Sequence, residues 1–132
     1  MGGFAGRAAP MGLRGSEQGK TAPFNRRFTM KIIRSKNFTA TRPWGALDIA
    51  NMGGITTRLH WTNQPYKWHV NDGEEVFAVL DGRVEMRYRE AGVEQSTVLE
   101  TGDVFYASAG TEHVAHPIGV ARILVVEAQG SV

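Results

Sequence analysis

The chain of 132 residues contains no cysteine. This absence excludes disulfides, cysteine-based zinc sites and thiol nucleophiles. The chain also lacks any run of about 18 apolar residues, so no segment of it is suited to crossing a membrane as a helix. An apolar stretch of roughly 7–15 residues of the kind found in secretory signals is missing as well, and we expect a cytoplasmic protein. Because no basic patch interleaved with aromatic residues occurs in the body of the chain, nucleic acid is not an expected partner.

The net charge of +2 is unevenly distributed. Residues 1–29 carry five basic residues against Glu17, a net charge of +4, whereas residues 30–132 carry 10 Lys and Arg against 12 Asp and Glu, a net charge of −2. Residues 1–29 are rich in Gly, Ala and Arg and lack apolar periodicity, which is typical of a flexible segment. We therefore predict a basic N-terminal tail at 1–29 and one domain at 30–132.

The domain is predicted to be all-β. Its short apolar stretches are separated by many of the 16 glycines and 5 prolines, and no segment after Met30 has a convincing helical period. Closely spaced strands joined by such turns favour a barrel or a sandwich. Strands are expected at 46–50, 55–61, 66–71, 75–80, 83–89, 95–99, 104–107, 112–115 and 121–127.

Two turn signals subdivide the longer stretches. Asp81-Gly82 lies between apolar and alternating segments and is typical of a hairpin turn. Val84, Met86 and Tyr88 should then face inward, with the charged residues between them facing outward. Pro117 and Gly119 predict a further turn before the last strand.

The stretch 76–80 is apolar on both faces. A small barrel interior covers only one face of a strand, so the other face needs a second cover. We therefore expect a homodimer.

Four residues form a candidate metal-ligand set. His69 and Asn71 are two apart and point the same way on a strand. Glu75 begins the apolar stretch after an acidic turn, and His113 comes much later in the chain. If the fold brings these side chains together they suit a metal ion; otherwise His69 and His113 are unrelated residues at strand ends.

Further polar residues have two possible roles each. His60 and Arg58 share one face of their predicted strand. If that face lines the barrel interior, His60 is a candidate acid or base and Arg58 a candidate partner for an anionic ligand. Otherwise both are ordinary strand residues. His116 is expected at the rim rather than as a ligand. Ser108, His113 and Asp103 lack the sequence pattern of a nucleophile elbow.

The spacing of these residues resembles that of the cupin superfamily. That family has a first motif G-x5-H-x-H-x3,4-E-x6-G and a second motif G-x5-P-x-G-x2-H-x3-N. This chain matches the motifs at His69, Glu75, Gly82, Gly102, Gly110 and His113. It departs from them at Asn63 for the first glycine, Asn71 for the second histidine, Ser108 for proline and Pro117 for the last asparagine. The resemblance covers about residues 45–128 and is similar to that of short, stand-alone cupins.

The resemblance implies a double-stranded β-helix, or jelly-roll-like barrel, with a divalent metal ion. His69, Glu75 and His113 would be ligands, and Asn71 would stand at or near a fourth position. Mn, Fe, Ni and Zn remain open as the metal. The implied function is a metal-binding cupin, either an oxygenase or an isomerase acting on a small polar or anionic molecule, or a non-catalytic ligand-binding or sensor domain.

Overall fold

The structure is a computed structural model that describes residues 30–131. Residues 34–131 belong to one compact unit; of the other unit, Met1–Ile33, only residues 30–33 are described. The predicted tail at 1–29 lies outside the described residues. The division of the chain at Met30 therefore stays a prediction.

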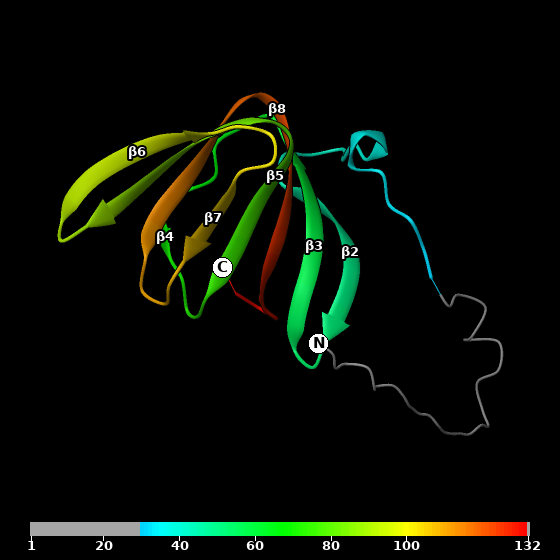
Figure 1. The fold of residues 1–132 in the computed structure, drawn as a ribbon, viewed down its shortest axis with the longest axis horizontal. Coiled ribbons are helices and arrows are strands. Elements are labelled where there is room, and N and C mark those ends of the chain that lie inside the picture. Colours follow the sequence, from blue (N-terminus) through cyan, green and yellow to red (C-terminus); the bar gives the residue numbers. More distant parts are fainter. Residues whose placement is uncertain (1–29, 132) are drawn as a thin grey trace, which may run out of the picture. The chain divides into compact units, whose positions relative to one another are not determined.

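The described part of the chain is built almost entirely of strands, which confirms the all-β prediction (Figure 1). No helix between residues 30 and 131 is long and apolar enough to cross a membrane. The elements are η4 (Ser35–Asn37), β2 (Gly45–Met52), β3 (Ile55–Thr62), β4 (His69–Val70), β5 (Glu75–Glu90), β6 (Val93–Leu99), β7 (Val104–Ala107) and β8 (Glu112–Ala128).

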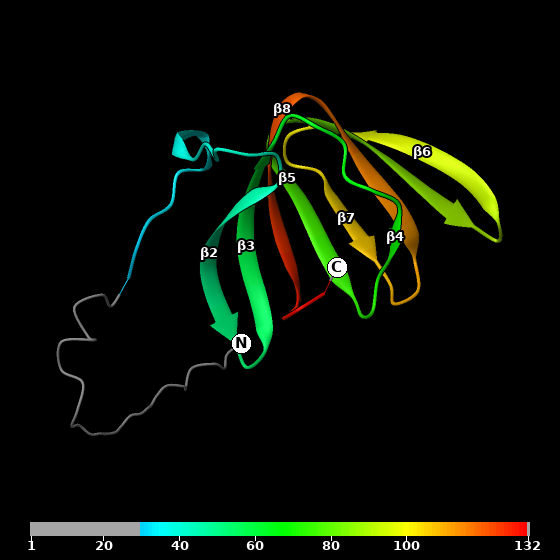
Figure 2. The same cartoon turned by 180° about the vertical axis from the view of Figure 1, so that it is seen from behind.

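The seven strands form one bent sheet. Its two long strands, β5 and β8, run through both halves, one on each side of the bend. The strand order is β2-β3-β8-β5-β6, with β4 also paired to β8 and β7 to β5. The first part of β5, 75–81, pairs with the last part of β8, 122–127, and the last part of β5 pairs with the first part of β8. Figures 1 and 2 show, from opposite sides, that both strands bend sharply together where the halves meet. The antiparallel pair therefore belongs to both halves.

The hairpin predicted at Asp81-Gly82 is wrong, because the chain bends at Gly82 without ending the strand. Residues 75–90 form one continuous strand, and only the register with β8 shifts, between Val79 and Asp81 and again between Asp81 and Arg83. Gly82 has a φ of +81° and lies against the backbone of Val120. Such a bulge bends and twists a strand without ending it. The turn predicted near Pro117 and Gly119 is wrong for the same reason, because 112–128 is also one strand.

Alternating side chains from both halves fill the core. The prediction that Val84, Met86 and Tyr88 face inward is confirmed: Val84 and Met86 are fully buried, and Tyr88 packs against the same cluster. Burial of these apolar surfaces is the main favourable contribution to folding. The buried cluster comprises Phe77, Val79, Val84, Met86, Leu99, Ala115, Ala121, Ile123 and Val125.

Arg122 holds the segment that precedes β2 against the sheet. Its Nη1 donates to Asp81 Oδ2 at 2.7 Å, its Nε to the carbonyl of Phe38 at 2.7 Å, and its Nη2 to Thr39 Oγ1 at 3.2 Å. These bonds use the spread donors of a guanidinium group. These bonds fix the path of the chain up to Trp44, whose side chain packs against the buried core cluster.

Gly82→Ala should destabilise the fold strongly. An added Cβ would overlap the carbonyl oxygen of Val120 and approach the Cα of Ala121 to 3.1 Å. Gly92→Ala is the matched control, because Gly92 has a φ of +79° but no neighbour within 4 Å of an added Cβ. Positive φ alone costs alanine about 1–2 kcal/mol, so thermal unfolding should show a loss of about that size for Gly92→Ala and at least twice as much for Gly82→Ala. Equal losses would mean that the contact with Val120 relaxes freely.

The homodimer stays a prediction, and one apolar face of the sheet is its expected site. Val76 pairs with Tyr106, and Val104 lies on the same strand as Tyr106; all three are exposed. Val104→Arg should shift the protein toward a monomer in sedimentation experiments, because a charge resists burial. Val93→Arg on β6 is the control, because the side chain of Val93 is 61% exposed, close to the 59% of Val104, and lies on another strand. A wild-type monomer at micromolar concentration would contradict the prediction.

Candidate metal centre

The pairing of β4 with β8 places two histidines side by side. His69, the first residue of β4, is the direct cross-strand partner of His113. Directly paired residues project from the same face of a sheet with their Cβ atoms about 4.5–5.5 Å apart. The two ring centroids lie 4.3 Å apart. This pairing rules out the alternative that the two residues are unrelated.

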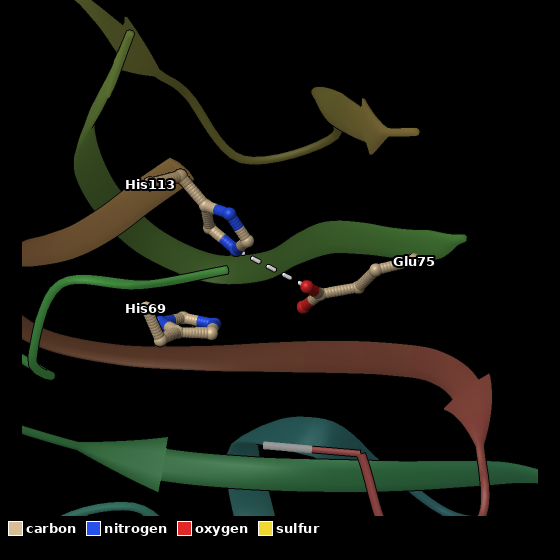
Figure 3. Close-up of side chains that lie close together, drawn as sticks. All are labelled: His69, Glu75 and His113. Carbon is tan, nitrogen blue, oxygen red and sulfur yellow. Dashed lines mark hydrogen bonds and ion pairs between the residues drawn. The ribbon is translucent and has the colours of Figure 1, made fainter. Parts of the chain in front are cut away.

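Glu75 completes a three-residue cluster (Figure 3). It begins β5, and its buried carboxylate Oε1 lies 3.1 Å from Nε2 of His113. One ligand atom from each of His69, Glu75 and His113 lies within 4.8 Å of the other two. Within residues 30–131 this is the only group of three or more His, Asp and Glu side chains so arranged.

Backbone carbonyls fix the tautomer of both histidines. Nδ1 of His69 lies 2.9 Å from the carbonyl of Lys67, and Nδ1 of His113 lies 3.2 Å from that of Thr111. A carbonyl only accepts hydrogen bonds, so each Nδ1 carries the proton and a neutral ring presents a lone pair at Nε2. Burial, followed by the neighbouring His113, lowers the pKa of His69 and favours its neutral form. Orientation of this kind by a backbone acceptor is typical of metal-ligating histidines.

The geometry suits a divalent cation. With His113 neutral, its Nε2 lone pair would face a lone pair of Glu75 Oε1 at 3.1 Å, an unfavourable contact. Either a second proton on the ring or a cation between the groups resolves this conflict. A cation also satisfies Nε2 of His69 at the same time. Two imidazoles and a carboxylate that converge in this way can hold a divalent ion and leave coordination positions open.

Asn71, two residues after His69, adds a buried carboxamide. It is 6% exposed, and neither its Oδ1 nor its Nδ2 has a hydrogen-bond partner among the described residues. Its backbone is held by the N–H of Gly110 and the carbonyl of Thr111. Leaving a buried polar group unpaired costs about 1–3 kcal/mol. A bound ion or its water ligand would supply the missing partner, although Asn71 is not among the residues that line the hollow of about 310 Å³ beside the cluster.

A hollow of about 310 Å³ opens beside the cluster. Its wall includes His69, Glu75 and His113, and aromatic side chains of Trp44, Tyr66 and Phe77. The rings of Trp44 and Tyr66 meet edge to face at 5.3 Å. Such a wall suits a small, flat or apolar ligand body.

His60 and Arg58 both face this hollow, as the alternation of their strand predicted for an interior face. Nδ1 of His60 donates to the carbonyl of Trp44 at 3.1 Å, so its Nε2 presents a lone pair. Burial is the main cause that lowers the pKa of His60. Nε of Arg58 donates to Asp48 at 2.7 Å, and Arg42 lies on the same wall.

The remaining candidates lie elsewhere. His116 pairs with Glu85 and lines no part of the hollow. The hydroxyl of Ser108 bonds to that of Thr111, and the carboxylate of Asp103 accepts the N–H of Glu100. A serine nucleophile activated by His113 therefore has no support.

Sequence reasoning missed Glu127. This residue pairs with Glu75 across β5 and β8 and lines the hollow. Burial, and then the charge of Glu75, raises the pKa of Glu127 to about 7. Counting in steps of two from the inward Ile123 and Val125 would have predicted that Glu127 faces inward.

Comparison with known proteins agrees with this geometry. A family model described as "Cupin domain" matches residues 60–127. The curated relative 3-hydroxyanthranilate 3,4-dioxygenase from Bos taurus is 32% identical over 81 residues, which are 61% of this chain and 26% of that protein. This chain therefore matches about a quarter of the relative's length.

Solved structures show the same fold. A cupin-2 domain protein from Shewanella frigidimarina has a TM-score of 0.61 at 24% identity, covering 68% of this chain and 85% of that one. A protein from Thermus thermophilus has a TM-score of 0.60 at 26% identity, covering 75% and 97%. The strands of this chain accordingly form a double-stranded β-helix, and the chain belongs to the cupin family.

Proposed function

We propose that this cupin binds one divalent metal ion through His69, Glu75 and His113 and acts as an oxygenase on a small anionic molecule. The observation that carries the proposal is the cluster itself: one ligand atom from each of His69, Glu75 and His113 lies within 4.8 Å of the other two, and Nδ1 of each histidine faces a backbone carbonyl. Iron or manganese fits this donor set best. Asn71 is proposed to stand at or near a fourth position.

The bound ion would supply open coordination positions for oxygen and for the ligand. The residues of the chain supply the remaining chemistry. Trp44 and Phe77 provide an apolar wall that limits the access of water, and Arg58 with Arg42 attracts a negatively charged group. His60, held neutral with Nε2 as an acceptor, is placed to take a proton or a hydrogen bond from the ligand.

The choice of an oxygenase rests on the relative from Bos taurus. Its name describes a dioxygenase whose substrate is a hydroxylated aromatic carboxylate. The matched region of this chain carries the cluster, and the hollow contains both aromatic side chains and arginines. An isomerase and a non-catalytic sensor are the other outcomes that experiments can reveal.

Metal content should depend on the cluster residues in a graded way. His113→Ala removes a ligand and should weaken binding by more than about 100-fold, whereas Asn71→Ala removes a weaker neutral donor and should cost about tenfold. Asn71→His should strengthen binding by adding an imidazole. His116→Ala is the control, because His116 lies outside the cluster. Elemental analysis after identical dialysis provides the measurement.

Two results would contradict the metal site. One is the absence of binding by the wild-type protein at saturating Mn, Fe, Ni and Zn. The other is full metal content in the His113→Ala protein. This variant is expected to fold, because the core cluster does not include His113.

Oxygen uptake tests the proposed activity. Iron-loaded wild-type protein should consume oxygen when 3-hydroxyanthranilate is added as the probe, and Arg58→Met should raise KM because the anionic group loses a partner. Arg83→Met, which removes an exposed arginine that does not line the hollow, is the matched control. Tight binding of the probe without oxygen uptake would favour the sensor, and turnover without oxygen would favour the isomerase.

A further inference from the structure

A row of polar residues leads from the metal cluster to the far edge of the sheet. Glu75 on β5 pairs with Glu127 on β8, Glu127 pairs with Thr56 on β3, and Thr56 pairs with Asn51 on β2. Direct cross-strand partners project from the same face. Because neighbouring strands lie about 4.8 Å apart, the row spans roughly 14 Å. The adjacent positions on β5 and β8, Phe77 and Val125, are apolar core residues, so this polar row is not general to the sheet.

A second hollow, of about 440 Å³, lies at the outer end of this row. It shares three lining residues with the first hollow, namely Arg58, Glu127 and Ser131. The two hollows are therefore adjacent, and the three residues that they share are all polar. Of the residues that line the second hollow, the proposed oxygenase chemistry uses only Arg58.

The lining of the second hollow differs in chemistry from that of the first. The first hollow carries two arginines and three aromatic side chains, whereas the second carries neutral amides and hydroxyls at Asn51, Gln129, Thr56 and Ser131. Its lining holds one cation, Arg58, and two carboxylates, Asp48 and Glu127, and Nε of Arg58 already donates to Asp48. This balance disfavours a second anionic group and favours hydroxyl groups, which both donate and accept hydrogen bonds.

The wall of the second hollow is held in place by hydrogen bonds. Nδ2 of Asn51 donates to Oε1 of Gln129 at 3.1 Å, and the N–H of Gln129 donates to the carbonyl of Gly54 at 2.8 Å. Oδ1 of Asn51 also accepts the N–H of Gly54 at 2.8 Å. The two amides are thus oriented before any ligand arrives, which lowers the entropic cost of binding.

We propose that the second hollow is a subsite for a neutral, hydroxyl-rich group, such as a sugar ring. The ligand of this protein would then be elongated, with its reacting end at the cluster and its hydroxylated end at Asn51 and Gln129. Only the reacting end rests on the proposed metal-dependent function. The subsite itself requires no metal and can be tested without it.

The test compares two ring-shaped probes on metal-free protein by NMR titration. Methyl β-D-glucopyranoside is the hydroxylated probe, and cyclohexylmethanol is the control of similar ring size. Each neutral hydrogen bond contributes about fivefold in affinity, so two of them predict that the glucoside binds at least about tenfold more tightly. Amide shifts should concentrate at Asn51, Gln129 and Gly130.

Variants identify the residues responsible. Asn51→Ala combined with Gln129→Ala should bring the glucoside to the affinity of cyclohexylmethanol. Gln95→Ala is the matched control, since it removes an exposed glutamine amide that bonds to Glu90 on the other half of the sheet. A cooperative thermal unfolding transition will verify that the double variant is folded, at a midpoint lowered by the loss of the bond between Asn51 and Gly54.

Three results would overturn the subsite. These are equal affinities for the two probes, shifts centred away from Asn51 and Gln129, or a double variant that binds the glucoside as the wild type does. A protein that binds no metal but passes this test would refute the proposed oxygenase alone. Metal binding without a preference for the glucoside would refute the subsite alone.

Discussion

The antiparallel pairing of β5 with β8 is the interaction on which the rest of the structure depends. Each strand belongs to both halves of the sheet, so the bend at Gly82 turns both of them together. Glu75 lies in the half where β5 meets the end of β8, whereas His113 pairs with Tyr88 in the other half. The bend brings these two residues to 3.1 Å across the interior. The cluster therefore connects the two halves of the sheet.

Buried polar groups concentrate in the same region. The side chains of His69 and His113 converge with the buried carboxylate of Glu75, and a second carboxylate, Glu127, lies one strand away. Such groups are costly in a protein interior unless they are paired. The raised pKa of Glu127 reflects that cost, since burial and the charge of Glu75 both oppose its ionisation. A cation between the histidines and Glu75 would reduce the repulsion between Glu75 and Glu127. It would thereby offset part of the cost of burying these carboxylates.

Local sequence patterns predicted the strands well and their connections less well. Alternation correctly placed Val84 and Met86 in the core and set Arg58 and His60 on one face. The hairpin predicted at Asp81-Gly82 was wrong, because a glycine with positive φ permits a bulge as readily as a turn. Which of the two forms depends on the neighbouring strand β8, whose long-range pairing no local pattern records.

The sequence by itself determined the all-β class, the inward and outward faces of most strands, and residue types that suit a metal site, because these follow from alternation and donor chemistry. The motif spacing, through its resemblance to cupins, also named His69, Glu75 and His113 together. Only the tertiary structure decided that Glu127 stands beside Glu75 and that the polar row runs on to Asn51. These neighbours come from strands far apart in the chain, and the register between such strands is set by packing of the whole sheet.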